Sequence, residues 1–220
     1  GPTTAPPLPP ADGRWVAAAS LQGNITVWDA ASGVVHSNIA AHRDEVLAIA
    51  FVPGDRTRLV SSSYDGTLRV WDVRTGQPLP GAVPSERAGG LVSALAISSD
   101  GKLLATAGAE TALWDLESFR KIAVLGTVDS AGGLLFGPGD RTLVQGDRQG
   151  ALHLWDVQTQ QPLPSVPALR SDGADAVQAL AMDAKSGQIA IAALGRILLR
   201  SGLPTGQLDA MLFQAGTEWG

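Results

Sequence analysis

Residues 41–74 read AHRDEVLAIAFVPGDRTRLVSSSYDGTLRVWDVR, and this stretch has the apolar-polar alternation of short β-strands separated by turns. Neighbouring side chains of a strand point to opposite faces of a sheet, which is what alternation reflects. Gly-Asp and Asp-Gly turns delimit three predicted strands: Val46 to Phe51, Arg58 to Ser62, and a strand that closes on Trp71-Asp72. The stretch therefore predicts an antiparallel sheet made of consecutive strands.

The Trp-Asp pair that closes this stretch recurs along the chain. The four pairs are Trp28-Asp29, Trp71-Asp72, Trp114-Asp115 and Trp155-Asp156. Their spacings are 43, 43 and 41 residues. A repeat of this length with four short strands per unit is typical of a β-propeller blade, whereas a β-sandwich supplies short strands without a fixed period.

With these repeats the chain resembles the WD-repeat propellers, over nearly all of its length after residue 10. The resemblance implies one all-β domain, residues 11–220, of about five four-stranded blades at about 11–41, 42–85, 86–127, 128–168 and 169–215. The first blade has no recognisable inner strand. The fifth carries Arg200-Ser201 where the Trp-Asp pair would stand, 45 residues after Trp155.

Two interpretations of ring closure stay open. The units form a compact closed ring of about five blades, or they are part of a larger ring completed by residues or chains outside this sequence. The second is favoured, because little sequence follows Phe213 to supply the missing strand. A homo-oligomer that completes the ring is one form of it. Residues 1–10, GPTTAPPLPP, are interpreted as the remnant of a cleaved tag and a Pro-rich lead-in.

A longer repeat relates the second and fourth units. The turn PGDRT at residues 53–57 recurs at 138–142, an offset of 85 residues. The segment WDVRTGQPLP at 71–80 recurs as WDVQTQQPLP at 155–164, an offset of 84 residues. These offsets indicate that a pair of units was duplicated.

Composition argues against several classes of function. The net charge is −5 and the pI about 5.1, with three lysines in 220 residues, so no basic surface for nucleic acid is predicted. Cysteine is absent, which excludes disulfides and thiolate metal sites. No apolar run has the length of a membrane span and no signal peptide is recognised, so no membrane partner and a cytoplasmic location are predicted.

The resemblance implies a structural hydrogen-bonded set in the second unit: His42, Ser61, Asp65 and Trp71. Burying an indole N–H and a carboxylate is costly unless both find partners. The other units lack parts of the set. Ala18 and Gln22 stand in its place in the first unit and Gln145 and Gln149 in the fourth, while the third keeps Thr106 in a shortened turn with Glu110. The second unit is therefore predicted to be the most rigid.

No catalytic or metal-binding pattern is recognised. His36, His42 and His153 fall in different units without metal-ligand spacing. No phosphate-binding glycine loop, nucleophile elbow or zinc-protease motif is found. The prediction is a protein without catalytic residues, metal or cofactor.

Recognition is the predicted function. Phrases such as TGQPLP resemble the propellers of bacterial multidomain signalling proteins, which implies a non-catalytic scaffold for a protein or peptide. In the family, the turns between the second and third strands and the links between blades form the usual docking face. Candidate partner-binding residues there are Arg43, Tyr64, Arg87, Arg148 and Arg170. The alternatives are a propeller that binds a small ligand or glycan between blades, and self-assembly through unclosed edges.

Overall fold

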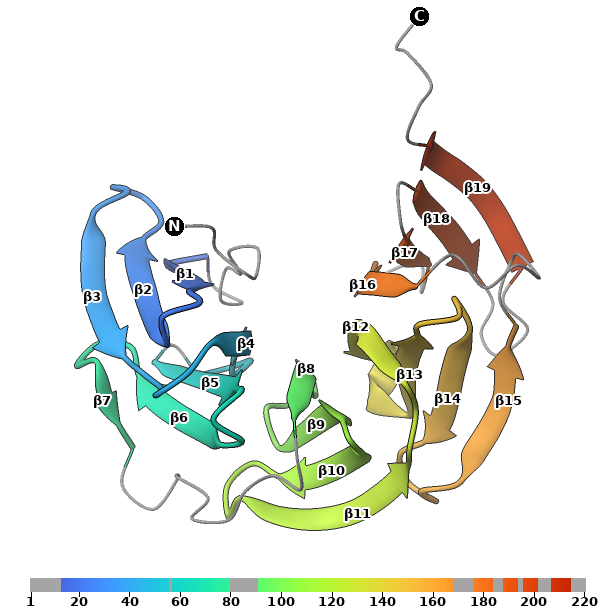
Figure 1. Ribbon diagram of the computed structural model, residues 1–220, viewed down its shortest axis with the longest axis horizontal. Helices are drawn as coiled ribbons and strands as arrows, with labels where there is room; N and C mark the ends of the chain where they lie inside the picture. The colour runs from blue at the N-terminus through green and yellow to red at the C-terminus, as the bar shows by residue number, and fades with distance from the viewer. Residues whose placement is uncertain are drawn as a thin grey trace, which may run out of the picture. The chain divides into compact units, whose positions relative to one another are not determined.

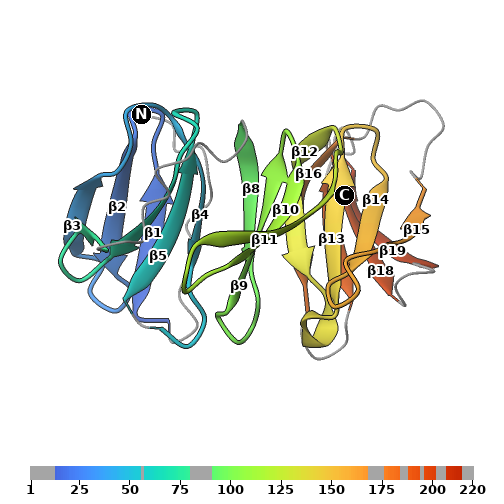
Figure 2. The same cartoon turned by 90° about the horizontal axis from the view of Figure 1, so that it is seen from below.

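The computed structural model describes residues 13–55, 57–79, 91–167, 176–183, 188–193, 196–201 and 207–214. Within these residues every regular element is a β-strand except the short 3-10 turn η1 (Pro138–Asp140) (Figures 1 and 2). The all-β prediction is confirmed. Contacts group the chain into two compact units, unit 1 (residues 1–126) and unit 2 (residues 127–220).

Unit 1 contains three antiparallel sheets, blades 1 to 3, whose strands pair in sequence order. Blade 1 consists of β1 (Trp15–Ala19), β2 (Asn24–Asp29) and β3 (Val35–Ala40). Blade 2 consists of β4 (Val46–Phe51), β5 (Arg58–Ser63), β6 (Leu68–Asp72) and β7 (Gln77–Pro78). Blade 3 consists of β8 (Val92–Ile97), β9 (Leu103–Gly108), β10 (Thr111–Asp115) and β11 (Arg120–Gly126).

Unit 2 contains two four-stranded sheets of the same kind, blades 4 and 5. Blade 4 consists of β12 (Ser130–Phe136), β13 (Thr142–Asp147), β14 (Leu152–Asp156) and β15 (Pro162–Val166). Blade 5 consists of β16 (Val177–Met182), β17 (Ile189–Ala193), β18 (Arg196–Ser201) and β19 (Gln207–Gln214).

The predicted strands match these elements closely, with two qualifications. Blade 1 has three strands in the described part of the chain, as predicted, and β1 occupies the second position of a blade. In blade 2 the fourth strand β7 spans only Gln77–Pro78 in the described part of the chain, and residues 80–90 lie outside the described ranges. The lead-in at residues 1–10 lies outside them too.

Blade 2 buries its two faces against its neighbours within unit 1, blades 1 and 3. In blade 2, Leu59 and Trp71 belong to the cluster shared with blade 1, whereas Val60 and Val70 belong to the cluster shared with blade 3. Figure 1 shows β4 between β1 and β8, and both pairs are in contact. Because burying one such side chain stabilises by about 1.5 to 3 kcal/mol, most of the stability of a blade comes from its neighbours.

In unit 2, small residues allow blades 4 and 5 to approach closely. A Cβ added to Gly146 on β13 would overlap the side chain of Val177 on β16. A Cβ added to Gly133 on β12 would lie 2.7 Å from Cγ of Leu180. These two glycines thus have a packing role between blades 4 and 5.

Candidate functional site

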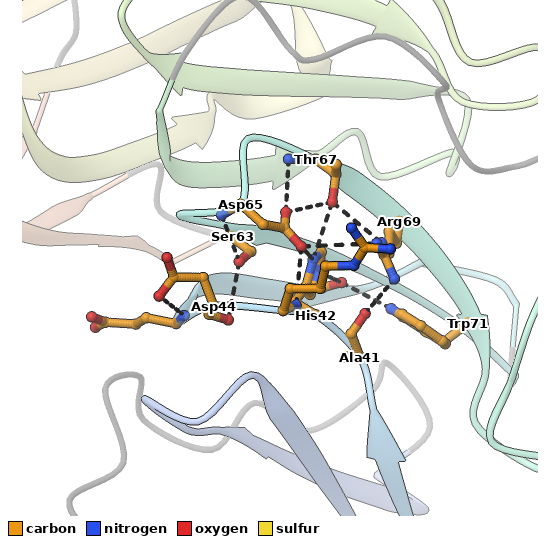
Figure 3. A network of polar contacts seen from close by, with 11 residues as sticks. Ala41, His42, Asp44, Ser63, Asp65, Thr67, Arg69 and Trp71 are labelled. Carbon is orange, nitrogen blue, oxygen red and sulfur yellow. Dashed lines mark hydrogen bonds and ion pairs between the residues drawn. The ribbon is translucent and has the colours of Figure 1, made fainter.

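The four residues of the predicted polar set lie together in blade 2 (Figure 3). The indole Nε1 of Trp71 donates to Ser61 Oγ at 2.8 Å, and this oxygen lies 2.7 Å from Nε2 of His42. The other imidazole nitrogen, Nδ1, lies 3.0 Å from Oδ2 of Asp65. The side chain of His42 has no exposed surface, and that of Asp65 is 10% exposed.

Further donors hold the Asp65 carboxylate. Thr67 donates to Oδ1 from its backbone N–H at 2.9 Å and from its hydroxyl at 2.6 Å. The backbone N–H of Arg43 donates to Oδ2 at 3.2 Å, and the guanidinium of Arg69 lies 3.8 Å from the same oxygen. Burial by itself would raise the pKa of Asp65, but these hydrogen bonds and the neighbouring His42 lower it to about 2.

Burial has the opposite consequence for the imidazole. It disfavours the charged form and lowers the pKa of His42, although the Asp65 carboxylate partly opposes this effect. The hydrogen bonds fit a neutral ring. Ser61 Oγ accepts from Trp71, so its own hydrogen points to an unprotonated Nε2, and Nδ1 carries the proton that faces Asp65.

In the other blades the Trp indole and the carboxylate near the turn have different partners or lack one part of the set. In blade 3 the Trp114 indole donates to Thr106 Oγ1 at 2.9 Å. In blade 1 Ala18 offers no hydroxyl, and Trp28 is only half-buried. In blade 4 the carboxylate of Asp147 accepts from backbone N–H groups of the following turn and lies 2.8 Å from Nε2 of His153.

The pairing of Asp147 with His153 was not predicted. The sequence comparison used Gln145 and Gln149, the positions that correspond to Ser61 and Asp65. A signal was nevertheless present, because the strand register places Asp147 at the position of Ser63 and His153 at that of Arg69.

The aspartate of each Trp-Asp pair holds the turn that follows it. Oδ1 of each carboxylate accepts from a backbone N–H three residues later, that of Ser32, Thr75, Ser118 or Thr159. The next residue has a positive φ: 69° at Gly33, 70° at Gly76, 54° at Phe119 and 60° at Gln160. In Asp156 the hydrogen bonds from the backbone and hydroxyl of Thr159 lower the pKa of the carboxyl.

Two of the five predicted partner-binding residues lie at one end of blade 2. Arg43 and Tyr64 are exposed, and the backbone N–H of Tyr64 donates to the carbonyl of Glu45 at 3.0 Å. Arg148 occupies in blade 4 the position of Tyr64, because its N–H donates to the carbonyl of Asp129. Its guanidinium Nε lies 3.1 Å from the Asp129 carboxylate. Arg87 and Arg170 lie outside the described residues.

Exposed apolar side chains accompany Arg43 and Tyr64 at the same end of the strands of unit 1. Tyr64 is 52% exposed, Leu21 in the β1–β2 turn 38%, and Leu91 before β8 38%. Hydrogen bonds from Ala41 and His42 to Gly23 join the first two blades at this end. At the other end the β8–β9 turn lies against Pro53 of blade 2, so blades 2 and 3 have the same orientation. We call Leu21, Arg43, Tyr64 and Leu91 the turn-end surface; the sequence comparison missed its two leucines.

A cleft of about 280 Å³ lies at the opposite end of unit 1. It is lined by charged side chains and one glycine: Arg58, Asp100, Gly101, Lys102, Asp115 and Glu117. Aromatic side chains, which would stack on a sugar or a flat ligand, do not line it. Across the described ranges, no group of three or more histidine, aspartate or glutamate residues has a geometry that could hold a metal ion. The described part of the chain also has no helix suited to crossing a membrane.

The order Ser61, His42, Asp65 is formally that of a nucleophile, a base and an orienting acid. Ser61 has no exposed surface, however, and its oxygen already accepts a hydrogen bond from Trp71. A substrate could not reach this hydroxyl without displacing the packed interior of blade 2. The geometry thus fits a structural role for the set.

Comparison with known proteins agrees with the architecture. The sequence profile of the family described as WD domain, G-beta repeat matches residues 33–72, which run from the end of the β2–β3 turn to the Trp-Asp pair of blade 2. Autophagy-related protein 16 of Arabidopsis thaliana is 24% identical over 197 residues, which cover 66% of this chain and 38% of that protein.

Two further relatives give the same picture. WD repeat and SOCS box-containing protein 1 of Danio rerio is 33% identical over 102 residues, 46% of this chain and 24% of that protein. Target of rapamycin complex subunit LST8 of Bos taurus is 25% identical over 162 residues, 69% of this chain and 47% of that protein. The chain thus spans less than half the length of each of these relatives. The repeat period, the antiparallel four-stranded sheets and these matches together show that the chain is similar to WD-repeat proteins and is built of blades of that kind.

Proposed function

We propose that this chain is a non-catalytic scaffold that binds a protein or peptide through the turn-end surface of unit 1. The observation that supports this most directly is the exposure of one large apolar side chain from each of three consecutive blades, Leu21, Tyr64 and Leu91, at one end of the strands. Exposed Arg43 lies on the link between the first two. Aromatic and arginine side chains contribute strongly to binding at interfaces.

The backbone beneath this surface is well ordered by hydrogen bonds. The β1–β2 turn accepts from the link through Gly23, and the link accepts from Tyr64 through the carbonyl of Glu45. Ser63 Oγ donates to the carbonyl of Asp44 at 3.1 Å. A surface that is already fixed costs less conformational entropy when a partner binds.

The WD-repeat family consists in general of non-catalytic scaffolds, which supports the absence of a catalytic role. We place the chain as a module of a larger bacterial signalling or regulatory protein in the cytoplasm, on the resemblance of its turns to such modules. Completion of the ring by a second copy is part of this proposal.

Selection of peptides from a random library against the chain tests the docking surface. The probes are the selected peptides, and their affinity is measured by fluorescence anisotropy. Tyr64→Ala and Leu91→Ala should each weaken binding about tenfold or more, because an interfacial side chain of this kind contributes more than about 1 kcal/mol. Arg74→Ala, in the β6–β7 turn at the opposite end, should leave binding unchanged. Peptides that respond to Arg74 and ignore Tyr64 and Leu91 would refute the assignment.

The alternatives have less support. A binding site for a small ligand or glycan would favour aromatic groups, which the cleft near Arg58 lacks. Self-assembly as the main activity predicts a mass in solution that rises with concentration. A strictly monomeric species across a dilution series would eliminate both self-assembly and the completion of the ring by a second copy.

A further inference from the structure

The buried network of blade 2 is connected to the surface above it. Asp65 Oδ2, which faces His42 Nδ1, also accepts the backbone N–H of Arg43. The N–H of Asp65 in turn donates to Ser63 Oγ at 3.1 Å, and this hydroxyl donates to the carbonyl of Asp44. Figure 3 shows His42 from the link and Thr67 beside the Asp65 carboxylate, with Ser63 next to the Asp65 backbone and Asp44 next to Ser63. The conformation of the segments that carry Arg43 and Tyr64 therefore depends on the network around His42.

The network has room for one imidazole proton. A second proton, on Nε2, would face Ser61 Oγ, which already accepts from Trp71. Ser61 would have to turn its own hydrogen away, and the described residues give this fully buried hydroxyl no other partner. A buried donor without an acceptor is destabilising, so a protonated His42 conflicts with the closed arrangement.

The charges around His42 come from few elements. The β5–β6 turn contributes Asp65 and β6 contributes Arg69. The link itself carries Arg43 and Asp44, both exposed. The β1–β2 turn of blade 1 contributes the backbone carbonyl of Gly23, which accepts the His42 N–H at 2.9 Å. Burial, the largest influence, and Arg69 both oppose protonation of His42, and together they outweigh the opposite effect of Asp65.

We propose that His42 is an acid-sensitive latch of the turn-end surface. A proton added to Nε2 leaves the buried Ser61 hydroxyl without an acceptor for its own hydrogen, and this cost favours a state in which the link at residues 42–45 and the turn at residues 63–67 open together. The surface then loses the ordered arrangement that binds its partner. The consequence for binding rests on the proposed docking function, whereas the opening itself does not.

Amide hydrogen exchange by NMR tests the opening without any partner. Once the intrinsic effect of pH on exchange is removed, protonation of an opened His42 with an ordinary pKa of about 6.5 should favour opening by up to about 25-fold between pH 7 and pH 5. The amides of Arg43 and Tyr64 should lose protection by this factor. The matched control is the amide of Ala109, which donates to the carbonyl of Leu91 at 3.1 Å at the same end of blade 3. Its protection should not change.

The variant His42→Gln removes the titrating group and should abolish the excess loss at Arg43 and Tyr64. If this variant does not fold, ¹⁵N titration of the wild-type imidazole replaces it: the ring must be neutral with a proton on Nδ1 at pH 7, and its midpoint must coincide with that of the amides. Protection that does not depend on pH, an equal change at Ala109, or midpoints that differ would overturn the latch.

The peptides selected at pH 7 provide the second arm. With the latch, their affinity should fall at pH 5 in the wild type and remain in His42→Gln. Opening seen by exchange while Tyr64→Ala has no effect on peptide binding at pH 7 would refute the docking surface and leave the latch. If Tyr64→Ala weakens peptide binding but amide exchange does not depend on pH, the latch is refuted and the docking surface is kept.

Discussion

Blades 2 and 4 have the same PGDRT turn and agree at eight of the ten positions of the segment that begins with their Trp-Asp pair, yet they satisfy their buried polar groups differently. In blade 2 the carboxylate sits in the turn, at Asp65, and its imidazole comes from the preceding link, at His42. In blade 4 the carboxylate sits two positions earlier, at Asp147 on the end of β13, and its imidazole comes from the third strand, at His153. Ser63 of blade 2 and Asp147 of blade 4 occupy equivalent positions. Each side chain accepts the backbone N–H two residues later: Ser63 Oγ accepts from Asp65, and Asp147 Oδ1 accepts from Gln149.

This difference shows that the backbone of a blade is maintained while its polar groups change. His42 stands three residues before the Glu45 carbonyl that accepts from the turn of blade 2. The residue three positions before the equivalent carbonyl, Asp129, is Gly126, the last residue of β11. Without an imidazole from the link, the carboxylate needs a donor from within the sheet. The result is also less buried: the His153 side chain is 34% exposed, whereas that of His42 is fully covered.

The largest expected effects come from removing the closed network of blade 2. Asp65→Ala and Trp71→Ala should each lower the free energy of unfolding by about 2 to 4 kcal/mol, because they leave buried partners unsatisfied and, for Trp71, remove packing. Urea denaturation measures the loss. The matched variants are Asp147→Ala, whose partner His153 is more exposed than His42, and Trp28→Ala, whose ring is only half-buried. Both should lower the free energy of unfolding by less. Equal losses in the two sets would remove the distinction between the blades.

Ser62 of blade 2 and Gly146 of blade 4 occupy equivalent positions, and substitution by alanine should change stability in opposite directions at the two. Gly146→Ala should destabilise by about 1 to 3 kcal/mol, because its new methyl group meets Val177. Val177→Ala should relieve most of this penalty in the double variant. Ser62→Ala, at the equivalent position of blade 2, removes a fully buried hydroxyl that has no partner among the described residues and should be neutral or stabilising. Thermal melting of the wild type, Gly146→Ala, the double variant and Ser62→Ala shows the direction of each stability change.

Acid should destabilise blade 2 through Asp65. Its folded pKa of about 2 lies below the ordinary value of 3.8, so the contribution is present above about pH 4 and is lost as the pH falls towards 2. Denaturation of the wild type and of Asp65→Asn at several pH values between 4.5 and 2.5 should show a stability difference that shrinks with acid. A constant difference would mean that the carboxylate is not preferentially stabilised in the folded state.

The smallest effect concerns the turns after the Trp-Asp pairs. Gln160 is exposed and has φ 60°, a conformation that costs a non-glycine residue about 1 kcal/mol. Gln160→Gly should therefore raise the melting temperature slightly. Gly76→Gln should lower it by a similar amount, because Gly76 has φ 70° and an added Cβ would meet only ordinary contacts at 3.8 Å. A stabilising Gly76→Gln would be inconsistent with strain in these turns.

Much of the fold could be predicted because its signals are local. The Trp-Asp spacing and the alternation around Val46 to Trp71 predict strands, order and repeat. The degenerate fifth blade was predicted from period alone, and β16 to β19 are found there. Contacts between blades could not be predicted in this way, because the neighbour of Gly146 is Val177, more than thirty residues away along the chain.

The candidate site was less accessible to prediction. His42, Ser61, Asp65 and Trp71 could be named because they stand at fixed distances from a Trp-Asp pair. Asp147 and His153 do not stand at these distances from the Trp-Asp pair of blade 4, and only the strand register reveals that they meet. The exposure of Leu21 and Leu91 depends on which side chains the neighbouring blades leave uncovered, which no local pattern encodes.

The central claim is that the link histidine closes the polar network of blade 2 and makes that blade the most stable one. Native-state hydrogen exchange compares the two blades at matched core positions, Val60 and Val70 against Val144 and Leu154. The account predicts slower exchange at Val60 and Val70 in the wild type, and loss of that advantage in His42→Ala. Equal rates in the wild type, or faster exchange in blade 2, would contradict it.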